Sequence, residues 1–152
     1  MRFVLLALLL GLSTACAKGF DVKGAPGFVE VHEKSSAYDY RAIVPDGVAV
    51  AVRSVPVEDG TDTAFWERAI LLRMRELDGY ALTSSSDVKS NDGLVGRELD
   101  FGHDEQGKPY TYRVRLFVKG DKLVLAEAGG ASDEMERWRP SVDWMLSSVR
   151  AR

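Results

Sequence analysis

The clearest strand in the sequence is Tyr110-Thr111-Tyr112-Arg113-Val114-Arg115-Leu116-Phe117-Val118. Apolar or aromatic side chains occupy every second position of this stretch, which is the period of a strand with two unlike faces. The turn Lys119-Gly120-Asp121-Lys122 follows, and a second apolar stretch runs from Leu123 to Ala128. We therefore expect an antiparallel hairpin over residues 110–128.

A second hairpin is predicted nearer the N-terminus. Residues 38–44 alternate in character, Pro45-Asp46-Gly47 makes a turn, and apolar residues resume from Val48 to Val55. The strand over 48–55 is apolar on both faces, so we expect it to be central in its sheet and covered on both sides. Two further strands are expected at residues 28–32 and 95–101, and the second of them joins the 110–128 hairpin in a meander.

Helical periodicity predicts a helix from about Ala64 to Leu77, with Asp62 or Thr63 as its N-cap. Its expected apolar face contains Phe65, Ala69 and Leu72, with Trp66, Ile70 and Leu77 close beside them. A short helix capped by Ser132 or Asp133 and a final helix after Pro140 are predicted near the C-terminus, whereas the polar stretch 84–93 is expected to be a loop. Clustered strands and helices in this order indicate an α+β fold with a mostly antiparallel sheet.

This arrangement resembles the PsbP/Mog-type fold, a three-layer α/β/α sandwich that recurs in small bacterial lipoproteins, including DcrB-like proteins. The resemblance covers about Phe28 to Arg150 and rests on four features: the tyrosine-rich hairpin before Pro45-Asp46-Gly47, the Phe65-Trp66 helix, the 113–128 hairpin and the closing helix 141–149. It implies a binding or assembly module, since that fold mostly serves protein partners. It carries over no functional residues.

The first sixteen residues have the layout of a secretory signal. Arg2 precedes the apolar run 3–12, and small residues then lead to Cys16. The run is shorter than the roughly 20 apolar residues needed to span a bilayer. The ending 12–16 resembles a lipobox, which implies that residues 1–15 are a signal peptide and that Cys16 is acylated. The alternative is ordinary signal peptidase acting on Ala15-Cys16-Ala17, with cleavage before Lys18.

Lipidation at Cys16 also accounts for the cysteine content. Cys16 is the only cysteine of the chain, so no internal disulfide is possible, and an exported free thiol would be unusual. Ala17 after the cysteine favours the outer membrane under the enterobacterial sorting rule, while an unlipidated chain would be periplasmic or secreted. We expect residues 16–27 to be the lipidated cysteine and a tether, and residues 28–152 to be a single domain.

Composition excludes several functions. The formal net charge is −3, which argues against binding nucleic acid or anionic lipid. His32 and His103 are far apart and Cys16 is assigned to the anchor, so we expect neither a metal site nor a cofactor. Ser86-Asp87-Val88-Lys89 has the Ser-x-x-Lys spacing but no helical context. These observations predict that the protein is not an enzyme.

Two groups of side chains are candidates for binding. Arg113 and Arg115 project together from their strand, and Arg97 lies beside them if its strand is in register; such a face would receive an acidic partner. The alternative is that these arginines form ion pairs with Glu98, Asp100 and Glu127. The second candidate is a pocket between helix and sheet, near Trp66, Tyr110 and Tyr112.

The leading hypothesis is a non-enzymatic envelope lipoprotein that binds another envelope protein or helps to assemble a complex. The second is a carrier or sensor of a small apolar ligand, held near the pocket residues named above. A hydrolase is the third. The oligomeric state is left open by the sequence.

Overall fold

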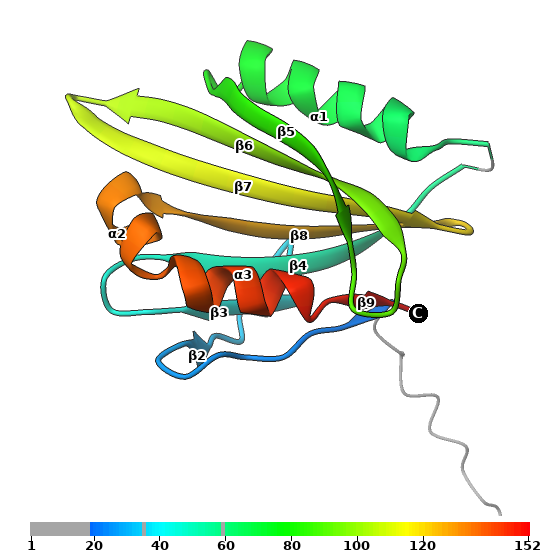
Figure 1. Ribbon diagram of the computed structural model, residues 1–152, viewed down its shortest axis with the longest axis horizontal. Coiled ribbons are helices and arrows are strands. Elements are labelled where there is room, and N and C mark those ends of the chain that lie inside the picture. Colours follow the sequence, from blue (N-terminus) through cyan, green and yellow to red (C-terminus); the bar gives the residue numbers. More distant parts are fainter. Residues whose placement is uncertain (1–18, 35, 59) are drawn as a thin grey trace, which may run out of the picture.

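A sheet of seven antiparallel strands forms the middle layer of the computed structural model, which describes residues 19–34, 36–58 and 60–152 (Figure 1). Every neighbouring pair of strands runs antiparallel. In spatial order the strands are β2 (Val29–Glu30), β3 (Tyr40–Ile43), β4 (Ala49–Pro56), β8 (Lys122–Ala131), β7 (Lys108–Lys119), β6 (Val95–Glu105) and β5 (Ala81–Lys89).

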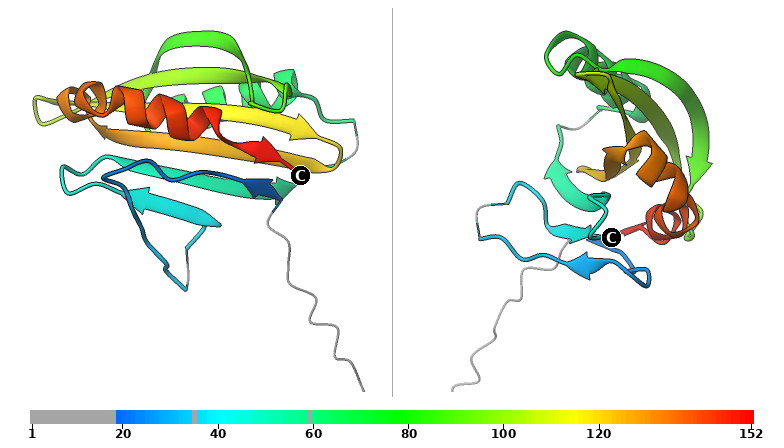
Figure 2. Two further views of the ribbon diagram at one scale, coloured as in Figure 1. Left: turned by 60° about the horizontal axis from the view of Figure 1, so that its bottom comes forward. Right: turned by 90° about the vertical axis from the view of Figure 1, so that its left-hand side faces the viewer.

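Helices cover both faces of this sheet (Figure 2). Helix α1 (Thr63–Glu76) lies over β5, β6 and β7, whereas α2 (Ser132–Arg137) and α3 (Arg139–Ser147) lie on the opposite face. The expected α+β fold, a three-layer α/β/α sandwich around a mostly antiparallel sheet, is therefore confirmed.

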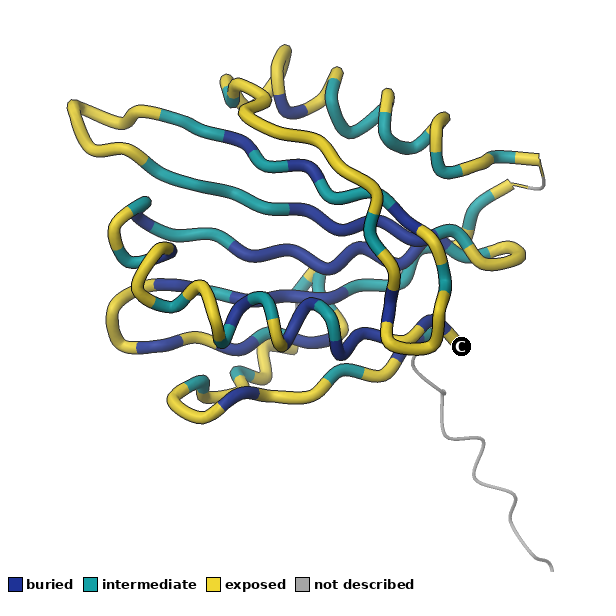
Figure 3. The backbone as a smooth tube through the Cα atoms, in the orientation of Figure 1, coloured by how far each residue is buried: buried dark blue, intermediate teal, exposed yellow. Residues whose placement is uncertain are grey.

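The alternating strands separate the apolar side chains into two cores. On the α3 face, Phe117 and Val50 pack with Val142 and Leu146 of the helix. On the α1 face, the core contains Leu99, Phe101, Val114, Leu116 and Leu125. Figure 3 shows that α3 is buried along its inner side, while α1 is mostly exposed or half-buried. Helix α1 is thus the more loosely packed layer.

Both predicted hairpins are confirmed. Strand β7 pairs with β8 from Tyr110 to Lys119, and β3 pairs with β4 across the predicted turn. Strand β4 is central, as expected, because Val50 on one face and Ala51 on the other are both buried. Helix α1 also begins as predicted: the Asp62 carboxylate accepts a hydrogen bond from the Phe65 backbone N–H at 2.8 Å.

The N-terminal segment corrects the expected tether over residues 16–27. Strand β1 (Phe20–Asp21) pairs with β9 (Arg150–Ala151), and the Phe20 side chain is only 2% exposed. Ala25 is also buried in the α3-side core. The domain therefore includes residues that we assigned to the tether, whereas residues 1–18, with Cys16, lie outside the described part.

Strand β5 corrects the expected loop at 84–93. It runs through the three serines 84–86 to Lys89 and pairs with β6 along its length. The sequence gives no alternation because β5 is an edge strand whose side chains are almost all exposed. The connection between the strands predicted at 95–101 and 110–118 is short, since Gln106 and Gly107 alone make the β6–β7 turn with positive φ angles of 55° and 81°.

The apolar face predicted for α1 is wrong at its centre, whereas Trp66 and Ile70, which were expected beside it, do face the sheet. Phe65 and Leu72 are 45% and 64% exposed, whereas Trp66, Ile70 and Met74 rest on the sheet. These three residues are spaced by four and form one row along a helix. Helix α1 has two apolar rows. It is rotated about its axis so that the 66–70–74 row packs against the sheet and the row with Phe65 and Leu72 faces outward.

Candidate functional site

A pocket of about 520 Å³ lies between the C-terminal half of α1 and the sheet. A second cavity of about 400 Å³ adjoins it and shares four of its wall residues. The shared residues are Tyr38, Tyr80, Tyr112 and Glu127. Apolar side chains complete the first cavity, namely Ile70 and Met74 from α1 and Val114 and Leu125 from the sheet. We treat the two cavities as one candidate site, the tyrosine pocket.

Small residues on β8 make room for the tyrosine pocket. Tyr112 lies directly opposite Gly129 in the β7–β8 pairing, and both belong to the wall of the second cavity. A Cβ atom on Gly129 would stand 2.8 Å from Cδ2 of the Tyr112 ring. The aromatic ring therefore lies closely against the backbone of β8, which only a glycine at this position allows.

A buried ion pair lies in the wall of the tyrosine pocket. The Glu127 residue is 4% exposed, and its Oε1 accepts a hydrogen bond from Nη2 of Arg53 at 2.9 Å. Within the described residues, Oε2 of Glu127 and Nε of Arg53 are both buried without a hydrogen-bond partner. Buried polar groups are normally satisfied. This pair therefore retains one free acceptor and one free donor.

The charge of Glu127 affects the neighbouring tyrosines. Burial, together with the nearby Glu127 carboxylate, raises the pKa of Tyr112 well above its usual value. The same two causes raise the pKa of Tyr38, and the Arg53 guanidinium, which lies 5.4 Å from the centre of the Tyr38 ring, opposes them. Both phenols are consequently protonated at neutral pH, and their O–H groups can donate hydrogen bonds to the Glu127 carboxylate.

The structure brings together part of the predicted ligand pocket. Tyr112 lines both cavities and Tyr110 lines the second. Trp66 lines neither; it packs in the α1-side core. Sequence reasoning missed Glu127 and Arg53 as a pair. The available signal was Glu127 itself, a single acid within the apolar stretch 123–128.

The three arginines do not form one surface. Arg97 lies opposite Leu116, whereas Glu98 lies opposite Arg115 and Asp100 opposite Arg113. Directly opposed residues point to the same face, so Arg97 is on the α1 face and the other two arginines are on the α3 face. Arg97 donates hydrogen bonds to Glu67 of α1 at 3.0 and 3.1 Å. The predicted joint partner surface is thus corrected.

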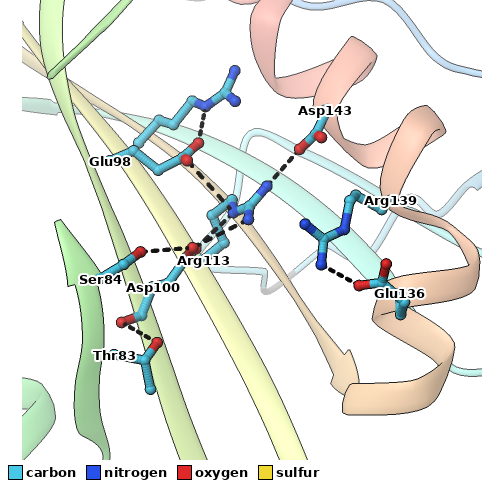
Figure 4. A network of polar contacts seen from close by, with 9 residues as sticks. Thr83, Ser84, Glu98, Asp100, Arg113, Glu136, Arg139 and Asp143 are labelled. Carbon is cyan, nitrogen blue, oxygen red and sulfur yellow. Dashed lines mark hydrogen bonds and ion pairs between the residues drawn. The ribbon is translucent and has the colours of Figure 1, made fainter. Parts of the chain in front are cut away.

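Arg113 and Arg115 form ion pairs, and little of either side chain is exposed. Figure 4 shows Arg113 among its acidic neighbours. Arg113 contacts Asp100, Glu98 and Asp143, and Arg115 is 8% exposed beside Glu98. The alternative expectation of ion pairs with Glu98 and Asp100 is therefore the correct one for these two side chains. Glu127 was expected in the same group but lies on the α1 face, paired with Arg53.

The described residues offer no obvious metal centre. Among residues 19–34, 36–58 and 60–152, no three His, Cys, Asp or Glu side chains converge in a way that could hold an ion. Asp104 accepts a hydrogen bond from the Gly107 backbone N–H at 2.8 Å, as turn residues commonly do. His103 lies against Tyr80, with ring centres 4.9 Å apart.

The sandwich and its strand order define a PsbP/Mog1-like fold. Solved structures with this fold include LpqN of Mycobacterium tuberculosis, which is involved in cell envelope biogenesis: it has 14% sequence identity, a TM-score of 0.65, and the match covers 86% of this chain and 81% of LpqN. Cyanobacterial PsbP (CyanoP) from Synechocystis matches with 12% identity and a TM-score of 0.59 over 95% of this chain and 99% of CyanoP.

The Ran-binding protein Mog1p of Saccharomyces cerevisiae also matches, with 12% identity and a TM-score of 0.57 over 88% of this chain and 90% of Mog1p. No protein-family model matches the chain, and no curated protein is significantly similar to it in sequence. The comparisons therefore establish the fold.

Proposed function

We propose that this protein is an exported, non-enzymatic binding protein that holds a small ligand in the tyrosine pocket. One observation carries the proposal: the pocket wall contains the buried ion pair of Glu127 and Arg53, each with a polar atom that has no partner within the described residues. Ligand sites typically have volumes of about 300–1,000 Å³ and apolar walls with a few placed polar groups. The tyrosine pocket has both properties.

Native mass spectrometry of protein purified from its own membranes tests this function. We expect a bound ligand on the wild type and its loss in Ala37→Trp, which places a large side chain in the wall of the first cavity. Ala64→Trp is the matched control, because Ala64 is exposed near the start of α1 and lines neither cavity. An empty wild type, or equal occupancy in the two variants, would contradict the proposal.

Export and anchoring form the second part of the proposal. The signal-like residues 1–15 and the lipobox-like ending support acylation of Cys16. Within the part of the chain that the structure describes, every helix is too short or too polar to span a bilayer. Only Ala17, Lys18 and Gly19 separate Cys16 from the buried Phe20, so acylation would hold the domain against the bilayer surface.

The intact mass of the mature protein tests the anchor. We expect an acylated chain that begins at Cys16, and we expect the acyl mass to be absent from a Cys16→Ala variant. An unmodified chain that begins at Lys18 would contradict acylation and indicate a diffusible exported protein.

A second candidate function is the docking of an envelope protein on α1. Its support is the apolar row of Phe65 and Leu72, which the fold leaves 45% and 64% exposed. A photo-crosslinking residue at Leu72 should then capture one defined envelope protein in cells, while the same residue at the exposed Glu136 should not. Equal patterns at both positions would argue against docking there.

A further inference from the structure

The charges around the tyrosine pocket neutralise one another. Arg53 pairs with Glu127 at 2.9 Å, and Nε of Arg73 lies 3.5 Å from Oδ2 of Asp78. Arg41, in the wall of the second cavity, pairs with Glu33 at 3.1 Å. Each charged residue of the described walls thus has an opposite partner. A ligand with a net charge would lose hydration without gaining a free counter-ion.

The two wall atoms that have no hydrogen-bond partner indicate which head group a ligand would need. Glu127 and Arg53 lie on the neighbouring strands β8 and β4, where Arg53 is opposite Leu125 and Glu127 is opposite Ala51. Oε2 of Glu127 can accept a hydrogen bond and Nε of Arg53 can donate one. A group that donates and accepts within a small volume, such as a carboxamide, would satisfy both atoms.

The aromatic rings of the pocket indicate what the rest of the ligand should look like. Tyr38, Tyr80 and Tyr112 line both cavities, and the rings of Tyr80 and Tyr112 have centres 5.9 Å apart. Met74 and Ile70 face them from α1. Flat apolar groups pack well against such rings.

We infer that the tyrosine pocket selects an uncharged ligand with a flat apolar body and a head group that both donates and accepts a hydrogen bond. The inference rests on the proposed ligand-binding function and adds the chemical class of the ligand. It requires that the pocket reject charged molecules of the same shape.

Three matched probes test this selectivity on the mature protein at neutral pH: a naphthyl carboxamide, the corresponding carboxylate and the corresponding naphthylmethyl ammonium. Isothermal titration calorimetry should show that the carboxamide binds about tenfold tighter than either charged probe. Equal or tighter binding of a charged probe would overturn the inference and leave the pocket itself in place.

Substitutions in the ion pair supply a more specific signature. Glu127→Gln keeps the side-chain shape but removes the partner charge of Arg53, so the preference should shift toward the carboxylate. Arg53→Met leaves the Glu127 charge without its partner, so the preference should shift toward the ammonium. This variant tests the same inference if Glu127→Gln does not fold. Glu136→Gln, in an exposed pair with Arg139, should leave all three affinities unchanged.

The two proposals fail in different ways. Unchanged selectivity in both ion-pair variants would overturn the uncharged-ligand inference. Failure of all three probes to bind would overturn it as well, and native mass spectrometry of the membrane-derived protein then decides the proposed function separately.

Discussion

Arg113 on β7 lies directly opposite Asp100 on β6, and two side-by-side hydrogen bonds join their side chains (Figure 4). The Nε–Oδ1 distance is 2.6 Å and the Nη2–Oδ2 distance is 3.1 Å. Nη1 of Arg113 donates to Asp143 of α3. Arg113 and Asp100 side chains are 15% and 18% exposed. This arginine consequently connects the sheet to the helical layer.

Replacing Arg113 with Met should lower the free energy of unfolding by about 3 kcal/mol, because it leaves the largely buried Asp100 carboxylate without its ion-pair partner and close to Glu98. Urea unfolding measures the change. Arg139→Met is the control: the Arg139 pair with Glu136 is largely exposed, so its loss should cost less than about 1 kcal/mol. Similar losses in the two variants would show that the buried network does not stabilise the fold.

Gly96 is predicted to tolerate no side chain. A Cβ atom there would lie 2.3 Å from the Leu116 carbonyl oxygen and 2.5 Å from Cδ1 of Phe117. Gly96→Ala should therefore lower the free energy of unfolding by about 3 kcal/mol, since the strands must move apart. At Gly102 the nearest atom, Cγ2 of Thr83, is 3.3 Å away, so Gly102→Ala should have a much smaller effect. Thermal or urea unfolding of both variants measures these effects. Equal losses of stability in the two variants would show that the close contacts at Gly96 do not matter.

Local patterns were enough to predict the elements in which one face is buried. The β7–β8 hairpin has strict alternation and a glycine turn, and α1 has a clear N-cap at Asp62. Strand β5 could not be predicted in the same way, because an exposed polar edge strand has no apolar period. Phe20 was missed because its partners on β9 lie at the other end of the chain.

The candidate site depends on strand register, which the sequence does not provide directly. Tyr112 was predicted because it belongs to a well-defined strand, but Arg53 and Glu127 are 74 residues apart and meet only through the β4–β8 pairing. The same limitation applies to Arg97. A difference of one position in register decides which face it occupies, and the structure places it on the α1 face, away from Arg113.

Tyr112 should make the stability of the protein pH-dependent in the alkaline range. Its pKa is raised in the folded state, from the ordinary value of 10.0, by burial and by Glu127. Above pH 10 the unfolded chain releases this proton while the folded protein keeps it, so stability falls as the pH rises. The slope is at most about 1.4 kcal/mol per pH unit for one proton.

Urea unfolding of wild type and Tyr112→Phe between pH 8 and 11 measures this contribution. The wild type should lose stability more steeply above pH 10, so its free-energy difference from the variant should change with pH only in that range. Tyr40 and Tyr80, whose pKa values are also raised, are present in both proteins and cancel in the comparison. Tyr38 interacts with Tyr112, so the measured difference belongs to these two phenols together. If the free-energy difference between wild type and variant did not change with pH, Tyr112 would not be a buried phenol with a raised pKa.

The N-terminal segment should contribute to stability as part of the domain. Phe20 is buried in the α3-side core, and its strand pairs with β9. Arg152, directly after β9, donates two hydrogen bonds of 2.6 Å to Asp21. Phe20→Ala should lower the free energy of unfolding by about 3–5 kcal/mol, as the loss of a buried phenyl ring usually does. Val29→Ala, at a side chain 65% exposed, should cost less than about 0.5 kcal/mol. If urea unfolding gave equal small losses, the segment would act as a tether after all, and an acylated Cys16 would leave the domain free to move away from the bilayer.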